Sequence, residues 1–294
     1  MTQQAFGGSW TEQKLSALQD YLSAYTRIFK SNPAARYYTT YYGDAFAGTG
    51  YMQRPEISPL STFFPELSEG AEEYAKGSAV RALEVDPPFD HYLFIERDPV
   101  RAAELLDLKK SFPARAPFID IRQGDAATVL EKWCQSMDWK KNRAVLFLDP
   151  FGMDVDWPLL EVIAGTRGID LWYLFPLFAV NRLLVRGQEP PEAWAKRLTA
   201  TFGTASWREK FYSAKHEYSL FEEDEPAQRI TKTADIPSIQ SFLVERLKSI
   251  FVAVSEAMVL ENSKNCPLYL LLFAAGNKAG ANAGLRIANY LVGR

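Results

Sequence analysis

The sequence has few cysteines, few histidines and no long hydrophobic run. Only 2 cysteines and 2 histidines occur among its 294 residues, which excludes a disulfide framework and offers no zinc-ligand spacing. No run approaches the roughly 18 apolar residues that a membrane span needs. The polar start Met1-Thr2-Gln3-Gln4 also lacks the basic and apolar parts of a signal peptide. We therefore expect a cytoplasmic protein with no membrane span and no metal site.

Neither sign of charge dominates the chain. Its 33 Lys and Arg stand against 36 Asp and Glu, for a net charge of -3, which excludes a strongly basic coat but leaves room for a local basic groove. The hydrophobic share of 47% and aromatic share of 14% are globular values. Because no repeat or low-complexity linker divides the sequence, we expect residues 1–294 to form a single domain.

Short apolar runs alternate with helical segments along the chain. An N-terminal helix is predicted over residues 11–32, where leucines and aromatics recur every three or four positions and Asn32-Pro33 ends the pattern. Strands are then expected at 37–46, 91–96, 117–122, 144–149 and 169–176, with helices at about 77–85, 99–112, 126–138 and 157–166. Uncharged strands separated by helices indicate a parallel sheet buried on both faces, and hence an α/β fold.

Two segments interrupt this alternation. Residues 51–76 contain three prolines and read as an insertion, and residues from about 178 to 250 read as a mostly helical insertion. After the second insertion, apolar runs at 251–260 and 267–275 are predicted to form a hairpin. A final helix is expected at about 283–292.

A glycine turn and a series of acids follow the predicted strands. The turn, Asp44-Ala45-Phe46-Ala47-Gly48-Thr49-Gly50, comes directly after the first strand. Acidic residues lie at the ends of the next three strands: Glu96, Asp125 and Asp149. Ligands of open parallel sheets bind at the carboxyl ends of the strands, so these residues should converge on one crevice. Each acid taken alone also has a simpler interpretation. Glu96 could be a surface acid on a loop, and Asp125 could cap the helix that begins at Ala126.

The turn favours a cofactor without a pyrophosphate. A dinucleotide turn prefers a third glycine and a helix that starts promptly, with its N-terminus at the pyrophosphate. Here Gln53 stands at the third glycine position, and the proline-containing insertion follows. Glu96, at the end of the second strand, is placed as the acceptor for ribose hydroxyls.

These motifs resemble class I S-adenosylmethionine-dependent methyltransferases. More narrowly, the chain resembles the bacterial three-Cys-motif partner (TcmP) family over about residues 12 to 290. The resemblance is carried by Asp44-Ala45-Phe46-Ala47-Gly48, Gly77-Ser78 with Ala82-Leu83, Phe147-Leu148-Asp149-Pro150-Phe151-Gly152 and Leu268-Tyr269-Leu270-Leu271-Leu272-Phe273-Ala274. One departure is Ala79, where the family pattern has proline.

The resemblance implies a fold, a cofactor and a partner. The fold is a Rossmann-like, mostly parallel seven-stranded sheet, with the last strand antiparallel between the fifth and sixth and helices on both faces. The cofactor is S-adenosylmethionine, and a protein with three cysteines, similar to radical enzymes, is the implied partner. The implied cofactor-binding residues are Asp44, Phe46, Ala47, Gly48, Gly50, Glu96 and Asp125.

The turn at the end of the fourth strand is the candidate catalytic site. Methyltransferases that act on planar amines carry a similar turn, in which an acid or amide and a proline carbonyl accept the amine hydrogens and an aromatic ring stacks on the base. Here these roles fall to Asp149, Pro150 and Phe151, with Gly152 permitting close approach. Such acceptors favour the geometry in which the nitrogen lone pair can attack. The alternative is that Asp149 contacts the cofactor or caps a turn and Phe151 belongs to the core.

Three functions follow, in decreasing order of support. The first is a methyltransferase that acts on a planar amine, such as a nucleobase amine of RNA or DNA. The second is a non-catalytic, methyltransferase-like module that docks the three-Cys-motif partner, and the third is a nucleotide-dependent oxidoreductase. The acid of Asp149-Pro150 favours the enzyme, because a docking module has no need of an acid at the end of that strand. The acidic balance slightly favours the module, because enzymes that act on nucleic acids are often basic.

Overall fold

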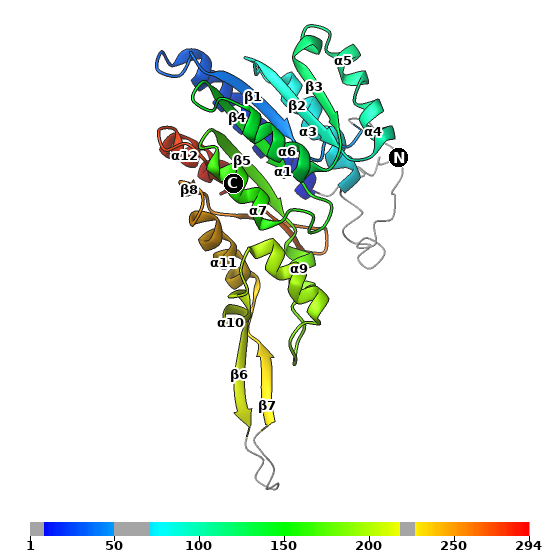
Figure 1. The fold of residues 1–294 in the computed structure, drawn as a ribbon, viewed down its shortest axis with the longest axis vertical. Coiled ribbons are helices and arrows are strands. Elements are labelled where there is room, and N and C mark those ends of the chain that lie inside the picture. Colours follow the sequence, from blue (N-terminus) through cyan, green and yellow to red (C-terminus); the bar gives the residue numbers. More distant parts are fainter. Residues whose placement is uncertain (1–8, 50–70, 218–226, 294) are drawn as a thin grey trace.

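A computed structural model of the chain describes residues 9–49, 71–217 and 227–293 (Figure 1). Its central feature is a set of five mutually parallel strands, all at or near the predicted positions. They are β1 (Thr39–Asp44), β2 (His91–Glu96), β3 (Ile119–Gln123), β4 (Asn142–Leu148) and β5 (Ile169–Phe175). Strands β2, β4 and β5 are almost fully buried, as uncharged runs covered on both faces should be.

The C-terminal strands complete the sheet in the expected way. The strand order is β3-β2-β1-β4-β5-β10-β8, and β10 (Pro267–Ala275) runs antiparallel to β5. The short strands β8 (Ala253–Val254) and β9 (Met258–Glu261) pair with successive parts of β10, so together they occupy one strand position. The described sheet therefore has seven strand positions with the antiparallel strand between the fifth and the sixth. This order confirms the predicted Rossmann-like class I methyltransferase fold.

Helices cover both faces of the sheet. They include α1 (Ser9–Ser31), α3 (Ala71–Glu84), α4 (Pro99–Glu104), α5 (Asp107–Ser111), α6 (Ala126–Ser136), α7 (Trp157–Gly165) and α12 (Ala281–Val292). Neighbouring residues of a strand point to opposite faces. Tyr41 of β1 contacts Trp133 of α6, whereas Asp44, three positions later, accepts a hydrogen bond from Ser78 of α3. Helices α3 and α6 therefore lie on opposite faces, and α1 packs between α3 and α12.

Helix α1 is the longest helix of the described chain and confirms the N-terminal helix predicted from residue 11 to residue 32. Its buried stripe includes Leu18, Tyr21, Leu22 and Tyr25, and Tyr21 contacts the sheet. The Tyr21 ring packs edge-on against Trp172 of β5 with ring centroids 5.3 Å apart. The spacing of apolar residues thus orients α1 on the sheet.

The segment from 177 to 250 contains the predicted helices. It also contains a β-hairpin that was not predicted. The helices are α8 (Leu177–Leu183), α9 (Glu192–Phe202), α10 (Trp207–Phe211) and α11 (Ile236–Lys248). Between α10 and α11, β6 (Tyr212–Glu217) pairs antiparallel with β7 (Ala227–Lys232), and this hairpin projects from the end of the molecule (Figure 1). A hairpin outside the main sheet needs no apolar alternation to bury a face, so periodicity gave no signal for it.

The other predicted boundaries differ in small ways. The predicted helix at 99–112 is two short helices, α4 and α5. Of the predicted insertion at 51–76, residues 51–70 lie outside the described residues, and residues 71–76 form the first part of α3. In the described part of the chain, no helix combines the length and apolar character needed to cross a membrane.

Candidate functional site

The carboxyl ends of β1, β2 and β4 bring three of the predicted acids to one edge of the sheet. Asp44, the last residue of β1, is in register with Phe94 of β2 and Phe147 of β4. Glu96 and Asp149 come two residues after those partners, so they lie just beyond Asp44 on the strands to either side. The predicted convergence at the strand ends is therefore present for these three residues.

The turn after β1 is held by the neighbouring strands. The Ala45 N–H donates to the Phe147 carbonyl at 3.2 Å, and the Ala47 N–H donates to the Ile95 carbonyl at 2.9 Å. Gly48 has φ of 61°, a left-handed conformation that favours glycine. The turn thus lies across the ends of β2 and β4 with a glycine that allows close approach to its backbone, while Gly50 lies outside the described residues.

Asp44 fixes this turn from inside the protein. Its side chain is buried, and its carboxylate accepts hydrogen bonds from the Ser78 hydroxyl at 2.7 Å and from the Phe46 N–H at 3.2 Å. Burial raises the pKa of Asp44 to about 6, although these donors oppose the shift. The carboxylate links α3 to the turn, and this position explains why an acid ends β1.

Glu96 is buried and oriented by the loop that follows it. Its side chain is 5% exposed, and Oε1 accepts a hydrogen bond from the Asp98 N–H at 2.9 Å. Among the described residues, no other group donates a hydrogen bond to this carboxylate. Glu96 therefore presents an oriented acceptor at the end of β2, as ribose recognition would require.

Asp125 caps helix α6. Its Oδ1 accepts from the Thr128 N–H at 3.0 Å and from the Thr128 hydroxyl at 3.1 Å, the arrangement of an N-terminal cap. The carboxylate is exposed, and the loop before it is tied to β2, since the Gly124 N–H donates to the Glu96 carbonyl at 2.9 Å. Asp125 therefore acts as a helix cap, as the alternative interpretation expected, in a loop joined to Glu96.

The candidate catalytic turn combines a buried acid with an exposed ring. The Asp149 side chain is 15% exposed, and burial raises its pKa to about 7, an effect that Lys14 opposes and Asp44 strengthens. Pro150 is buried, whereas Phe151 is 38% exposed with the Arg101 guanidinium 5.9 Å from its ring centroid. Gly152 has φ of 69°. Phe151 is therefore not a core residue, and its ring is accessible beside the acid.

Lys14 is a site residue that the sequence analysis missed. It is 1% exposed, its Nζ lies 3.9 Å from Asp149 Oδ1, and the Trp10 ring centroid lies 4.6 Å from the same nitrogen. Burial lowers the pKa of Lys14 to about 7, against the attraction of Asp149 and Asp44. The signal was present: Trp10, Lys14 and Leu18 follow one another at intervals of four, which places a lysine on the buried stripe of α1.

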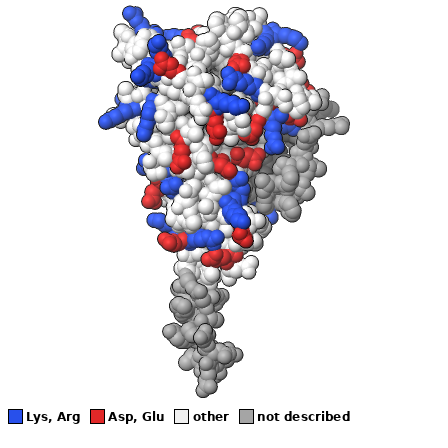
Figure 2. Space-filling view, in the orientation of Figure 1, with Lys and Arg blue, Asp and Glu red and all other residues white. Residues whose placement is uncertain are grey.

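Burial or an ion pair accounts for a cysteine and two basic residues outside the strand ends. Burial raises the pKa of Cys134 to about 12, so its thiol is unreactive. The described residues contain no cluster of His, Cys, Asp and Glu that would hold a metal. Of the basic residues after β5, Lys196 pairs with Glu192 at 2.7 Å and Arg197 pairs with Asp156. On the face drawn in Figure 2, basic and acidic side chains are interspersed, without a continuous patch of one sign.

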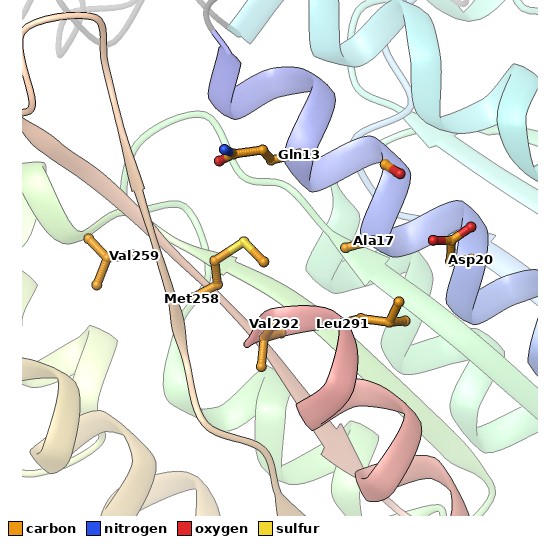
Figure 3. A pocket seen from close by; sticks show the side chains of 8 residues that line it. Gln13, Ala17, Asp20, Met258, Val259, Leu291 and Val292 are labelled. Atoms are coloured by element: carbon orange, nitrogen blue, oxygen red, sulfur yellow. The ribbon is translucent and has the colours of Figure 1, made fainter. Parts of the chain in front are cut away.

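A separate pocket lies between α1, α12 and β9 (Figure 3), with a volume of about 380 Å³. Gln13, Ser16 and Asp20 of α1 form its polar side. The remaining lining residues are apolar: Ala17, Met258, Val259, Leu291 and Val292. None of the predicted site residues lines this pocket, and it holds no combination of groups that suggests chemistry.

Comparisons with known proteins find similarity only among solved structures. No protein-family model and no curated protein matches the sequence. A Legionella pneumophila protein is 15% identical with a TM-score of 0.41, covering 84% of this chain and 94% of its own. A putative S-adenosylmethionine-dependent methyltransferase from Listeria monocytogenes is 10% identical with a TM-score of 0.34, covering 86% and 97%.

A third similar structure is that of M. jannaschii TYW2 in complex with AdoMet. It is 11% identical with a TM-score of 0.28, and the match covers 76% of this chain and 74% of that one. Likenesses this distant carry no conclusion about activity. The function of this chain has to follow from the geometry at the ends of β1, β2 and β4.

Proposed function

We propose that this chain is an S-adenosylmethionine-dependent methyltransferase that acts on a planar amine, such as an exocyclic amine of a nucleobase in RNA or DNA. The observation that carries the proposal is the turn after β4, where the largely buried Asp149 is followed two residues later by the exposed ring of Phe151. This turn adjoins the glycine turn after β1, and Glu96 ends β2 on the other side of β1.

The residues at the strand ends fit the proposed cofactor. The Glu96 carboxylate, oriented by the Asp98 N–H, suits the hydroxyls of a ribose. The turn at Gly48 offers close access to backbone, and Phe46, Ala47 and Gly50 complete the proposed cofactor contacts with Asp44 and Asp125 beside them. When bound, the cofactor would supply an electrophilic sulfonium methyl group for transfer to the amine nitrogen.

The chain's own residues act on the amine. The Asp149 carboxylate and the Pro150 carbonyl accept the two amine hydrogens, which favours the geometry in which the nitrogen lone pair is free to attack. The Phe151 ring stacks on the planar base and fixes its approach. Asp149 then takes the proton that the methylated nitrogen loses, and a pKa raised to about 7 by burial suits this exchange.

Two measurements test the proposal in sequence. Calorimetric titration with S-adenosylmethionine and, separately, with NAD should show saturable binding of S-adenosylmethionine alone, weakened in Glu96→Ala. Transfer of labelled methyl groups to nucleosides, RNA and DNA should then identify the acceptor. Binding of NAD instead would favour an oxidoreductase, and binding of neither ligand by the folded protein would contradict the proposal.

A second candidate is a docking module for a three-Cys-motif protein partner. The projecting hairpin favours it, since in the described residues β6 and β7 pair only with each other and extend away from the sheet (Figure 1). Co-expression with such a partner should then yield a complex that a hairpin-shortened variant fails to form. A complex formed without any binding of S-adenosylmethionine would favour the module over the enzyme.

A further inference from the structure

Lys14 is a buried cation that has no role in the reaction proposed above. Lysine is almost never fully buried unless it is paired, because its ammonium loses its hydration. Here the side chain is 1% exposed, in a helix whose buried face is otherwise mostly apolar and aromatic. A methionine or leucine would serve the packing of α1 equally well. The charge itself therefore calls for an explanation.

The surroundings of Lys14 place its charge against the candidate catalytic acid. Its Nζ lies 3.9 Å from Asp149 Oδ1, an ion-pair distance. The ring centroids of Trp10 and Tyr269 lie 4.6 Å and 5.7 Å from the same nitrogen. Aromatic faces stabilise an ammonium without removing its charge. Lys14 Nζ therefore lies between two aromatic rings and the Asp149 carboxylate.

The charges around this pair are mostly negative. Asp44 at the end of β1 interacts with both Lys14 and Asp149, and Glu96 at the end of β2 acts on Asp44. The phenols of Tyr42 on β1 and Tyr269 on β10 also face these carboxylates, and burial keeps both phenols neutral by raising their pKa. Without a positive charge, burial and the nearby acids would together favour the protonated form of Asp149.

We infer that Lys14 is a positioning residue whose ammonium shifts Asp149 towards its ionised form, in which both carboxylate oxygens can accept the hydrogens of the methyl acceptor. A protonated carboxyl would offer one acceptor oxygen and one donor, the wrong pairing for an amine. The inference rests on the proposed function for its catalytic consequence. It also makes α1 part of the active site, although this helix lies outside the strand-end motifs.

The direct test is the protonation of Asp149 with and without the lysine charge. The resonance of ¹³C-carboxyl-labelled aspartate, assigned through its loss in Asp149→Asn, should titrate in Lys14→Met with a midpoint raised by roughly one pH unit or more, a tenfold change in the protonation equilibrium. Lys14→Arg keeps the charge and should titrate near the wild-type midpoint. The matched control is Lys30→Met, which removes a lysine of the same helix that pairs with Asp90 at 2.5 Å and should leave the Asp149 titration unchanged.

Activity provides the second readout. Once an acceptor is known, the acidic limb of the pH–rate profile should move upward in Lys14→Met and return in Lys14→Arg, an effect that a purely structural lysine would not produce. If Lys14→Met does not fold, Lys14→Gln takes its place, with folding checked by circular dichroism. An unchanged Asp149 midpoint in a folded, uncharged variant would overturn the inference. Absence of S-adenosylmethionine binding by the wild type would instead overturn the proposed function, and the titration could still succeed.

Discussion

Helix α1 contacts two partly buried aspartates, one at each end of the sheet. Near its N-terminus, Lys14 faces Asp149 beyond the carboxyl end of β4. Two turns later, the Tyr21 hydroxyl donates a hydrogen bond to Asp170, the second residue of β5, at 3.4 Å. Burial raises the pKa of both acids, to about 7 for Asp149 and about 6 for Asp170. Burial and a raised pKa therefore do not distinguish the two positions.

The hydrogen-bond and ion-pair partners of Asp149 and Asp170 do distinguish the two positions. The Asp170 carboxylate takes a donor on each oxygen, from Tyr21 and from the Gly276 N–H at 3.2 Å, so it joins α1, β5 and the residue after β10. A side chain at Gly276 would have its Cβ 2.2 Å from the Ile169 carbonyl oxygen, so this junction is closely packed. Asp149 instead faces a cation and adjoins the exposed ring of Phe151. The Arg143 charge also acts on Asp170, but both oxygens of that carboxylate already accept from neutral donors, as in a structural acid. Asp149, which pairs with Lys14 two residues before an exposed ring, has the features of a reacting group.

Substitution of Asp149 is expected to have the largest effect. Asp149→Asn removes the negative charge and one acceptor, so methyl transfer should fall roughly 100-fold or more, the scale of losing a preorganised electrostatic contact. S-adenosylmethionine binding should change little. Measuring kcat in parallel with calorimetric titration checks both, and retained turnover would assign Asp149 to the structural class with Asp170.

Glu96→Ala should have the second-largest effect, a weaker binding of the cofactor. A hydrogen bond to a charged acceptor contributes about 1.5–3 kcal/mol, so the Kd for S-adenosylmethionine should rise by roughly 10- to 100-fold. Asp98→Ala provides a matched control, because it removes an acid from the same loop and keeps the backbone N–H that orients Glu96. Equal weakening by the two variants would contradict a specific role for Glu96.

Asp170→Asn should change stability and leave transfer intact. The amide oxygen accepts from one donor, while the amide N–H₂ leaves the other donor unsatisfied, so the free energy of unfolding should fall by about 1–3 kcal/mol. Because the folded pKa of Asp170 is about 6, above the unfolded value of 3.8, the folded state holds this proton longer. The contribution of this group to stability therefore decreases as the pH rises from 3.8 to 6.

Urea unfolding of the wild type and of Asp170→Asn at pH 4 and pH 7 measures that contribution. The wild type should lose more stability over this interval than the variant does, since the asparagine does not titrate. A large loss of transfer at full stability would show that Asp170 reaches the active site and would contradict a structural role for it.

Phe151→Ala should give the smallest effect. The ring is 38% exposed, so its removal should leave stability nearly unchanged. Loss of stacking on the acceptor is worth about 1 kcal/mol, and the KM for the acceptor should rise by roughly fivefold with kcat less affected. Phe151→Trp, which keeps a stacking face, should recover the wild-type KM, and a loss of thermal stability in Phe151→Ala would indicate that the ring packs rather than binds.

The sequence predicted most of the sheet because its strands are buried on both faces. The runs at 91–96 and 144–149 are β2 and β4 within one residue or two, since an uncharged run between helices has few other stable arrangements. The β6–β7 hairpin was missed because it lies outside the sheet and needs no apolar pattern. Lys14 was overlooked because a lysine on an amphipathic helix is normally solvent-exposed.

The sequence by itself determined which residue types stand at the strand ends. Acids end β1 and β2 and follow β4, and a glycine lies in the turn at Gly48. These are local features, set by strand length and turn conformation. Only the tertiary structure decided which donors and charges surround each acid. That difference depends on where α1 crosses the sheet, with Lys14 against Asp149 and Tyr21 against Asp170. The free energy of a buried charge is set by its neighbours in space, and those neighbours are far apart in the chain.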